Sequence, residues 1–390
     1  MEVTDVRAVP LSDPVPDERQ HRTDLGTKVK TDSVLVLVEA DDGTTGMGAS
    51  LGQPSAVAAI VEESLAPLVE GEDPRDTTRC WEKMYDGSRW PPSIERGYSQ
   101  PREDRRGLTL EAISGVDIAL HDLAAKSVGL PLYRYLGAVR HDVRAYASGG
   151  WAAGEAAEDE LRGYVEQGFD AAKMRVVGEE SSATFDVDAT VERVRAARRG
   201  VGDAELMVDA HGSLDVSTAI RLAERLEQFD LAWFEEPVSP DDHAGLAEVR
   251  EATSIPIATG EREFTRFDFH SLFEAGACDI AQPDIARAGG ITELERIAAM
   301  ASARGLRVAP HAWGSGVLFA ASIHFALSTP NCHVLEVSQG YMPMLFDLFE
   351  EEFDVSDGRV SPPDRPGLGF TLRDDYRERF EYEPGPEYVF

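Results

Sequence analysis

The sequence predicts an α/β protein in which an α+β domain precedes a closed barrel of parallel strands. Three observations predict this fold. The first 140 residues contain a hairpin pattern and a long amphipathic helix, eight short apolar runs separated by helix-length segments follow, and ionisable residues end six consecutive runs. Eight consecutive parallel βα units are the number that closes a barrel. A β-sandwich would require hairpins, which this later part of the sequence lacks.

Two local patterns predict the first domain, residues 1–140. The run VLVLVEADDGTTGMG, which begins at Val34, places an Asp-Gly turn between two strand-like stretches and predicts a hairpin. The run LTLEAISGVDIALHDLAAKSVG, residues 108–129, has apolar residues at helical spacing and ends at a glycine, which predicts a long helix. We expect the polar stretches 13–24 and 87–106 to be loops.

The barrel is predicted for residues 141–352. Intervening segments such as VSTAIRLAERLEQF and ITELERIAAMASARG have the apolar periodicity of amphipathic helices. The alternation ends near residue 353, and we expect the proline- and charge-rich segment 353–390 to pack back on the first domain. The eight strand candidates are VRAYAS at 143, AAKMRV at 171, ELMVDA at 205, LAWFEE at 231, IPIATGE at 255, DIAQPD at 279, LRVAPH at 306 and CHVLEV at 332.

Composition limits the classes of function. The 390 residues include 71 acidic and 38 basic side chains, for a formal net charge of −33. Such a charge argues against binding nucleic acid or an anionic membrane. Because molar salt screens this self-repulsion, the composition suggests a halophilic protein from a salt-adapted cytoplasm. Three cysteines without a short spacing and no apolar signal sequence also lead us to expect a cytoplasmic protein with reduced thiols.

Ionisable residues end six consecutive strand candidates, at intervals of 26, 26, 23, 27 and 25 residues. They are Asp209, Glu235, Glu261, Asp284, His311 and Glu336. In a parallel barrel the chemistry takes place at the carboxyl ends of the strands. We therefore expect all six side chains on one rim.

Asp209, Glu235 and Glu261 would be three carboxylates that converge from adjacent strands. Without a partner they would repel one another, whereas a divalent cation between them removes the conflict. Carboxylate oxygens with room for water and substrate suit Mg²⁺, with Mn²⁺ as a possible substitute. The alternative for each residue is a solvated carboxylate at a strand end.

Two histidines are candidate acid–base groups. Asp284 beside His311 would fix the imidazole tautomer and raise its basicity, so His311 is predicted to be a general base; the alternative is a structural hydrogen-bonded pair. His211 lies two residues beyond Asp209. If the strand geometry continues, both side chains project to the same side and His211 can act as a general acid. The alternative is a loop histidine in solvent.

Lys173 and Arg175 lie two residues apart on the second strand candidate and are expected to point the same way. Lysine is scarce here, with only five in the chain, so its presence in a predicted buried strand needs a reason. Two cations opposite three carboxylates and a metal could neutralise an anionic substrate and the charge that develops during its reaction. The alternative is a salt bridge to a neighbouring acid.

Taken together, these motifs make the sequence resemble the enolase superfamily, and within it the mandelate racemase subgroup. The resemblance runs nearly end to end. It is carried by ISGVDIALHDLAAKSVGLPLYRYLG, KMR, VDAHG, FEEPV, ATGERE, QPDIARAGGIT, APHAW and VLEV. The run GEREFTRFDFHSLFEAGACDIAQPDIARAGGITELERIA together with DAH looks most like the sugar-acid dehydratases of the galactonate and gluconate type.

The resemblance implies a modified TIM barrel, (β/α)7β, with an α+β capping domain built from both termini. It also implies Mg²⁺ on Asp209, Glu235 and Glu261. The implied reaction removes the proton α to the carboxylate of a sugar acid (an aldonate), passes through an enediolate and expels the β-hydroxyl to yield a 2-keto-3-deoxy acid.

The resemblance also implies individual roles. His311 with Asp284 would be the base and His211 the acid that assists hydroxide departure. Glu336 would hydrogen-bond the substrate carboxylate, as an electrophilic partner if protonated. The racemases of the subgroup carry a lysine where Arg175 stands, and a guanidinium loses a proton far less readily, so two-base racemisation is disfavoured. Lys173 remains either a base or an electrostatic stabiliser.

Two alternatives stay open at this point. One is a racemase, epimerase or cycloisomerase on the same scaffold, and the other is a catalytically silent barrel that only binds a ligand. We expect a small-molecule sugar-acid substrate, no nucleic-acid or membrane partner, and a homo-oligomer. The fold does not determine which sugar acid is used.

Overall fold

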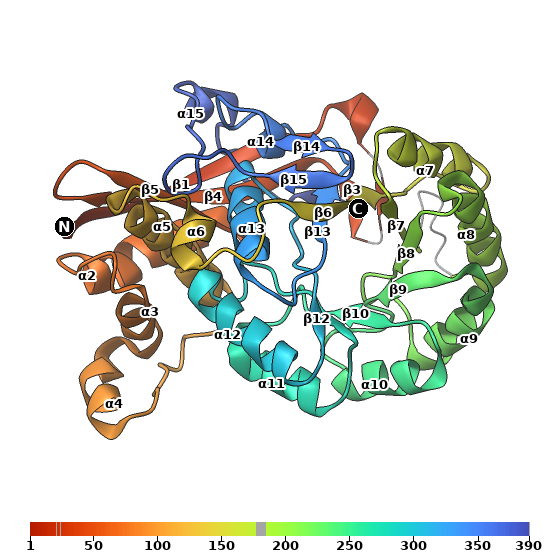
Figure 1. Cartoon of the computed structure of the whole chain (residues 1–390), viewed down its shortest axis with the longest axis horizontal. Helices are drawn as coiled ribbons and strands as arrows, with labels where there is room; N and C mark the ends of the chain where they lie inside the picture. The colour runs from red at the N-terminus through yellow and green to blue at the C-terminus, as the bar shows by residue number, and fades with distance from the viewer. Residues whose placement is uncertain (21, 24, 177–184, 390) are drawn as a thin grey trace.

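The computed structural model of the chain describes residues 1–390 except 21, 24, 177–184 and 390. Figure 1 shows two parts. A sheet covered by helices, built from the N-terminal residues, lies beside a ring of strands surrounded by further helices. The C-terminal segment runs along both parts.

The N-terminal part, called the cap below, is built on an antiparallel sheet in the order β1-β4-β5. Its strands are β1 (Val3–Pro14), β4 (Lys30–Ala40) and β5 (Thr45–Ser50). The predicted hairpin is confirmed as β4–β5, and the predicted long helix as α5 (Leu108–Ser127), which packs on this sheet. The helix lies so close to β5 that a Cβ atom at Gly48 would be 2.0 Å from the carbonyl oxygen of Gly115.

The polar stretches of the cap are more structured than expected. Residues 87–106 were expected to be a loop, but they contain a helix whose first turn holds two prolines, a position that suits proline because no hydrogen bond is lost there. The remaining cap elements are η1 (Asp17–Arg19), β2 (Arg22–Thr23), β3 (Gly26–Lys28), α1 (Pro54–Ile60), η2 (Val61–Leu65), α2 (Ala66–Val69), α3 (Thr77–Asp86), η3 (Gly87–Arg89), α4 (Trp90–Arg96) and α6 (Leu132–Leu136).

All eight strand candidates form parallel strands. Neighbours in the chain pair in order from the first to the seventh, the eighth pairs with the first, and a parallel bridge between Val308 and Cys332 joins the seventh to the eighth, so the ring closes. Apolar residues such as Tyr146, Met207 and Trp233 fill its interior. The strands are β6 (Val143–Gly149), β7 (Ala171–Arg175), β8 (Glu205–Asp209), β9 (Leu231–Glu235), β10 (Ile257–Thr259), β11 (Ile280–Ala281), β12 (Arg307–Val308) and β13 (Leu335–Ser338).

Amphipathic helices surround the ring. Asp186, Asp215 and Asp242 each accept backbone N–H groups at the start of a helix, which satisfies donors that the first turn leaves free. Across the described residues, no helix is both long enough and apolar enough to cross a membrane. The helices are α7 (Ala156–Glu166), α8 (Val187–Val201), α9 (Val216–Leu226), η4 (Glu227–Phe229), α10 (His243–Ala252), α11 (Thr265–Glu274), α12 (Gly290–Ala303), α13 (Gly316–Ser328), α14 (Pro343–Phe346) and α15 (Tyr376–Arg379).

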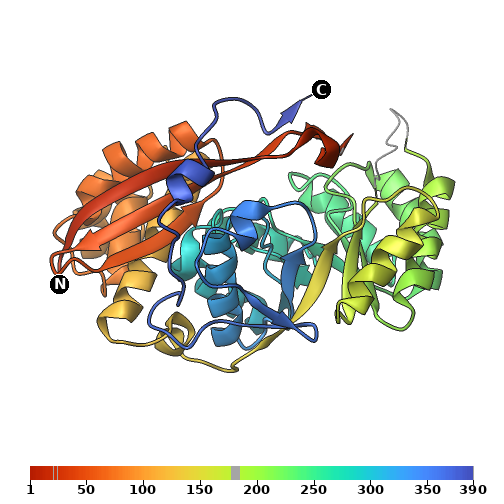
Figure 2. The ribbon, with the colours of Figure 1, turned by 90° about the horizontal axis from the view of Figure 1, so that it is seen from above.

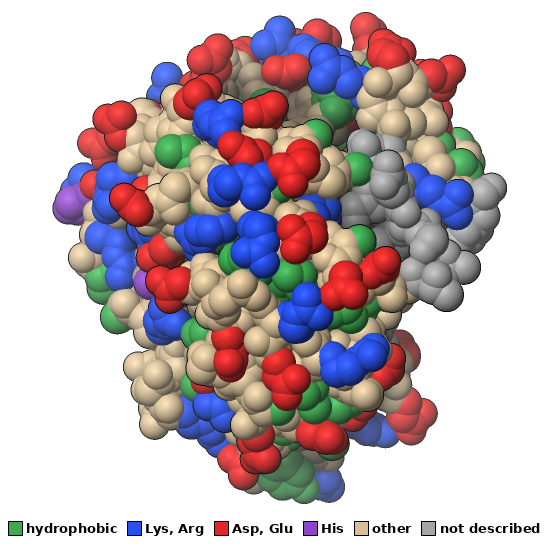
Figure 3. All heavy atoms as spheres, turned by 90° about the vertical axis from the view of Figure 1, so that its right-hand side faces the viewer, with side chains coloured by type: hydrophobic (Ala, Val, Ile, Leu, Met, Phe, Trp, Pro, Cys, Tyr) green, Lys and Arg blue, Asp and Glu red, His purple; other side chains and the backbone are tan. Residues whose placement is uncertain are grey.

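Charges of both signs are interspersed on the helical side of the barrel that Figure 3 shows. Several of the cations are ion paired there, for example Arg199 with Glu158 at 2.7 Å (Nε to Oε2) and Arg225 with Asp188 at 2.8 Å (Nη1 to Oδ1). Because these pairs are exposed, each contributes little to stability, although it offsets charge locally.

The C-terminal segment divides between the two parts. β14 (Asp354–Ser356) and β15 (Arg359–Ser361) form a hairpin that extends the barrel sheet at β6, whereas β16 (Tyr388–Val389) pairs with β3 of the cap. Figure 2 shows this last strand beside the far end of the cap strands, which reach across above the barrel. The segment also contacts the cap before its last strand, because the Leu368 N–H donates to Asp122 Oδ1 at 2.7 Å and Glu381 forms a β-bridge with Leu11 of β1. The domain boundaries at residues 140 and 352 stay predictions.

A buried carboxylate ties the cap to the barrel. Glu293 of α12 is fully buried and accepts hydrogen bonds from Arg266 and from Arg296 (Nη1, 2.9 Å). Trp81 of cap helix α3 lies against both guanidinium groups, with ring-centroid distances of 5.4 and 5.0 Å, and donates its indole N–H to the carbonyl of Gly289 at 2.7 Å. This cluster fixes how the cap sits on the barrel.

We expect Glu293→Ala to lower the free energy of unfolding by about 2 to 3 kcal/mol, because it removes the buried carboxylate that both arginines share and leaves them only Glu82, at 3.7 and 3.1 Å. The arginine side chains are 20% and 27% exposed, which keeps the loss below that of a fully buried pair. Denaturant unfolding measures this loss. Glu295→Ala, an exposed position on the same helix, is the control, and an equal effect at both positions would contradict the role of the cluster.

Candidate active site

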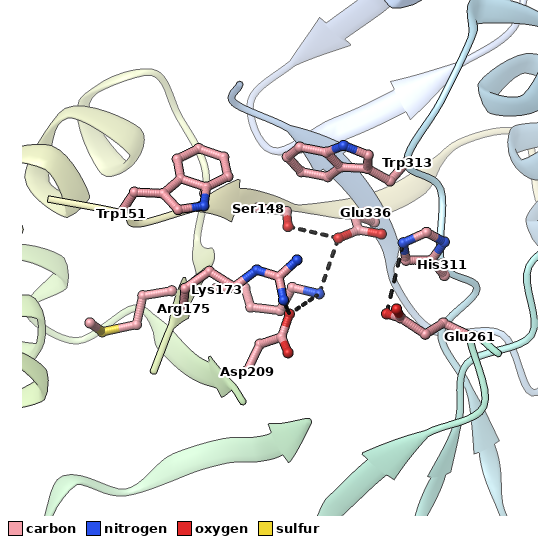
Figure 4. Close-up of a pocket in the computed structure, with 11 residues that line it drawn as sticks. Ser148, Trp151, Lys173, Arg175, Asp209, Glu261, His311, Trp313 and Glu336 are labelled. Carbon is pink, nitrogen blue, oxygen red and sulfur yellow. Dashed lines mark hydrogen bonds and ion pairs between the residues drawn. The ribbon is translucent and has the colours of Figure 1, made fainter. Parts of the chain in front are cut away.

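A small pocket opens at the carboxyl ends of the barrel strands (Figure 4). Six of the predicted site residues line it: Lys173, Arg175, Asp209, Glu261, His311 and Glu336. Glu235, His211 and Asp284 contact these residues without lining the pocket. The parallel barrel thus brings together residues that are spread over more than 160 positions of the chain, as their places at strand ends predicted. The enclosed volume is about 20 Å³, roughly the room of one water molecule.

Lys173 lies at the centre of the carboxylates. Its Nζ atom is 2.5 Å from Glu235 Oε1, 3.1 Å from Glu336 Oε1 and 3.7 Å from Asp209 Oδ2. Burial by itself lowers the pKa of Lys173, but the charges of Glu235 and Glu336 outweigh burial and raise the pKa well above its ordinary value. In this arrangement Lys173 is a charged donor, which favours electrostatic stabilisation over a role as base.

Arg175 faces the same carboxylates from the end of β7. Its Nη1 atom lies 3.2 Å from Asp209 Oδ2. The strand end is held by Arg193 of α8, a buried residue that donates to the carbonyl oxygens of Gly150, Ala152 and Arg175. The sequence does not indicate this role of Arg193, because helical periodicity alone does not show that an arginine turns inward.

Asp209 and Glu235 are the last residues of β8 and β9, whereas Glu261 lies two residues beyond the end of β10. All three candidate metal ligands are engaged with protein groups. Asp209 and Glu235 are 2% and 1% exposed and face Lys173, and Glu235 Oε2 also accepts from Trp233 Nε1 at 2.9 Å and Gln282 Nε2 at 2.7 Å. In the part of the chain that the structure describes, no three Asp, Glu, His or Cys side chains are grouped closely enough to hold a metal ion. The donor chemistry fits a hard divalent cation, whereas the arrangement in this structure is that of an ion-paired network.

Asp284 and His311 form the predicted pair. His311 Nδ1 donates to Asp284 Oδ2 at 2.5 Å, and the fully buried Asp284 also accepts from the backbone N–H of Ala286 at 2.7 Å. His311 Nε2 points toward Glu261, 3.8 Å from Oε2. Burial by itself lowers the pKa of His311, but the charge of Glu261 and the hydrogen bond to Asp284 outweigh it and raise the pKa to about 10.

His211 reaches the site by a different geometry from the one expected. β8 ends at Asp209 and His211 has a φ of 51°, so the strand geometry does not continue and the condition for parallel projection fails. The backbone N–H of His211 donates to Asp209 Oδ1 at 2.8 Å, and its Nε2 lies 3.7 Å from Glu261 Oε1. The imidazoles of His211 and His311 thus approach different oxygens of one carboxylate.

Glu336 is surrounded by donors. Ser148 Oγ donates to Oε1 at 2.7 Å and the Ala312 N–H to Oε2 at 2.8 Å. Burial raises the pKa of Glu336, but Lys173 and His311 outweigh burial and lower the pKa to about 2. An ionised Glu336 does not favour the electrophilic role that a protonated carboxyl would have.

Two tryptophans form the wall of the pocket away from the carboxylates (Figure 4). Trp151 and Trp313 meet edge to face with ring centroids 5.8 Å apart. The loop of Trp151 is fixed by Glu160, which accepts from the backbone N–H groups of Trp151 at 3.3 Å and Ala152 at 2.8 Å. Trp151 was missed at the sequence level, although a tryptophan just after the first barrel strand was the available signal.

The structure is a capped parallel barrel with carboxylates and a histidine–aspartate pair at its carboxyl rim. These features define a class of protein, which comparison with known families identifies. The model of the mandelate racemase / muconate lactonizing enzyme N-terminal domain matches residues 6–137, and the model of the enolase C-terminal domain-like family matches residues 156–376. The chain belongs to the enolase superfamily, in its mandelate racemase / muconate lactonizing enzyme group. The resemblance seen in the sequence is confirmed.

Three relatives match over most of the chain. The L-rhamnonate dehydratase of Saccharopolyspora erythraea is 36% identical over 94% of this chain and 90% of its own length. The D-galactarolactone cycloisomerase of Agrobacterium fabrum is 35% identical, and the arabinonate dehydratase of Saccharolobus solfataricus is 32% identical. Both cover 89% of this chain and 90% of their own length.

Two solved structures confirm the fold. A member of the enolase superfamily from Polaromonas sp. JS666 has a TM-score of 0.88 at 32% identity and covers all of both chains. A racemase from Streptomyces coelicolor A3(2) with bound magnesium has a TM-score of 0.82 at 31% identity and covers 97% of this chain and 98% of that chain. The predicted modified TIM barrel with an N-terminal cap is therefore confirmed.

Proposed function

We propose that the protein is a Mg²⁺-dependent hydro-lyase that converts a sugar acid, an aldonate, to a 2-keto-3-deoxy acid. The observation that carries the proposal is the Asp284–His311 pair, because His311 lines a pocket together with Lys173 and two tryptophans and turns its outer nitrogen, Nε2, toward Glu261. Two of the three relatives described above are sugar-acid dehydratases, which supports this reaction class.

Asp209, Glu235 and Glu261 would hold the divalent cation, Mg²⁺ or in its place Mn²⁺. Their oxygens are the ligands that these ions prefer. When bound, the cation supplies charge that offsets Glu261 and neutralises the substrate carboxylate. Since Lys173 engages Asp209 and Glu235 in this structure, we expect the ammonium group and the cation to share or compete for these oxygens.

The residues of the chain then have distinct tasks. Glu261 raises the pKa of His311 in this structure, and a cation held at Glu261 would offset that charge and let His311 Nε2 lose its proton. Nε2 would then accept the proton α to the substrate carboxylate, while Asp284 accepts from Nδ1 and keeps the ring in the tautomer whose acceptor is Nε2. Lys173 and Arg175 stabilise the negative charge that develops on the carboxylate, and Glu336 orients Lys173 through its 3.1 Å contact. His211 donates a proton to the leaving β-hydroxyl, which departs as water.

Substrate binding is expected to change the contacts of Arg175. The side chain of Arg175 is 29% exposed and lies 3.2 Å from Asp209, and we expect it to move off Asp209 as the acid enters, because the substrate carboxylate competes for the guanidinium group. The proposed substrate is a small molecule. We also propose that the enzyme is a cytoplasmic homo-oligomer and that it works in concentrated salt.

A substrate panel tests this function. We expect purified protein in molar KCl with Mg²⁺ to form 2-keto-3-deoxy acids from at least one C5 or C6 aldonate, to stop when a chelator is added, and to recover with excess Mg²⁺. Exchange of the α-proton with solvent deuterium without keto-acid formation would instead indicate racemisation. Full activity in the chelated protein would contradict the metal requirement.

A cycloisomerase is the second candidate, because a relative with that activity is 35% identical over 89% of the chain. The same His311 base would serve either reaction, and the distinction lies in whether the β-substituent leaves as water or as a ring oxygen. Incubation with sugar-acid lactones separates the two. Lactone consumption without consumption of free aldonates would favour the cycloisomerase.

A further inference from the structure

The cap places a second buried lysine near the pocket. Lys28 ends β3, which lies between β2 and β16 in a small antiparallel sheet. Its side chain is 6% exposed, and its Nζ atom lies 5.8 Å from the centroid of the Trp313 ring. Trp313 lines the pocket and follows His311 by two residues. The indole of Trp313 therefore contacts the Lys28 ammonium and also lines the pocket.

Lys28 has no hydrogen bond and no ion pair within 4.0 Å among the described residues, apart from its contact with the indole. Three charged groups do act on it. Burial lowers the pKa of Lys28, Arg175 lowers it further, and Glu387 and Asp13 partly oppose this. Lys28 therefore carries donors that no described protein group accepts, and donors of this kind normally find an acceptor.

Lys30, two residues further along the chain, is a lysine of the same region whose ammonium group does have acceptors. Its side chain is about as buried, yet its Nζ atom is 2.8 Å from Asp32 Oδ2, donates to the carbonyl of Glu383 and lies 5.3 Å from the Tyr382 ring centroid. The cap therefore supplies acceptors for one lysine and leaves the other without them.

The C-terminal strand holds Lys28 in this position. Tyr388 pairs with Lys28 across β16 and β3, and the Val29 N–H donates to the carbonyl of Glu387 at 2.9 Å. The Glu387 carboxylate in turn accepts the Asp32 N–H at 2.6 Å. The position of the ammonium over Trp313 is thus set by the fold.

We infer that Lys28 donates a hydrogen bond to the terminal oxygen of the substrate chain, at the end remote from the reacting carbons. The inference rests on the proposed function, since it assigns one end of the sugar acid to His311 and Lys173. A chain that extends from these residues along Trp313 would end under Lys28. A terminal hydroxyl and a terminal carboxylate share the acceptor chemistry that Lys28 lacks among the residues the structure describes.

The test compares Lys28→Met with Lys30→Met on three acids of equal length. One ends in a hydroxyl (an aldonate), one in a carboxylate (the aldarate) and one in a methyl group (the 6-deoxy acid). In Lys28→Met, the ratio of kcat/KM for the oxygen-terminated acid to that for the 6-deoxy acid should fall about ten- to a hundredfold, the range of one hydrogen bond to a charged group. A larger loss with the aldarate identifies a terminal carboxylate, and a larger loss with the aldonate identifies a terminal hydroxyl.

The control variant separates recognition from stability. Lys30→Met removes an ion pair from the same region of the cap, so it should change stability while keeping the substrate ratio within about twofold. Equal losses on all three acids in Lys28→Met, or the same change of ratio in Lys30→Met, would overturn the inference. If the wild-type protein dehydrates none of the acids, the proposed function fails first. The affinities of the three acids for wild type and Lys28→Met, measured by calorimetry, then test the role of Lys28. If none of the three acids binds, both the proposed function and the inference on Lys28 are overturned.

Discussion

His311→Asn is expected to lower kcat for dehydration by roughly 10²- to 10⁴-fold, the contribution of a positioned general base. Asparagine keeps a polar side chain that can still donate to Asp284, but it cannot accept the α-proton. The loss should appear equally in the rate of α-proton exchange with deuterium oxide, measured by NMR, because the same step is affected. Since Asp284 is the buried partner of the ring, Asp284→Asn should cause a smaller loss of the same kind.

The control for this prediction is another histidine. His141 is exposed and contacts Tyr133 in the connection between the cap and the barrel, so His141→Asn should retain activity within about twofold. An activity of His311→Asn within tenfold of wild type would show that a different group removes the proton. Lys173 would then be the first residue to test.

Lys173→Met is expected to lower the free energy of unfolding by about 3 to 5 kcal/mol in the presence of a chelator. The substitution leaves Asp209, Glu235 and Glu336 buried beside one another without the ammonium group that neutralises them in this structure. The same change should also reduce activity strongly, because the developing charge on the substrate carboxylate loses a donor. Denaturant unfolding and the dehydration assay measure the two effects.

The effect of Mg²⁺ on the stability of Lys173→Met tests where the cation binds. If a divalent cation and Lys173 use the same oxygens, then adding Mg²⁺ should stabilise Lys173→Met more than it stabilises the wild type, because binding to the folded state raises stability by mass action. Lys126→Met is the matched control, since its ammonium is 2.7 Å from Asp122 Oδ2 within the cap. An equal response to Mg²⁺ in both variants would place the ion somewhere other than at these carboxylates.

Periodicity was informative wherever the local pattern and the tertiary environment agreed. The strand beginning at Val143 and the helix from Leu108 were predictable because their apolar spacing matches the face they bury. α4 was missed because its two prolines look like a loop signal, although proline is compatible with a first helical turn. The pairing of β16 with β3 was also missed, since two short segments at opposite ends of a chain carry no pattern that specifies each other.

The candidate site shows the same division. Its residue types and their spacing of one βα unit were visible in the sequence. The left-handed backbone of His211 and the inward turn of Arg193 were not, because each depends on neighbours from other segments. The ionised state of Glu336 likewise follows from Lys173 and His311, which reach it from two other strands.

The sequence by itself determined that six ionisable side chains would meet at one rim, because a parallel barrel brings the carboxyl end of every strand to the same edge. Only the tertiary structure decided which of those charges face one another. It placed Lys173 among three carboxylates and Lys28 over Trp313, because electrostatic pairing depends on separations of a few ångströms that residue spacing along the chain does not specify.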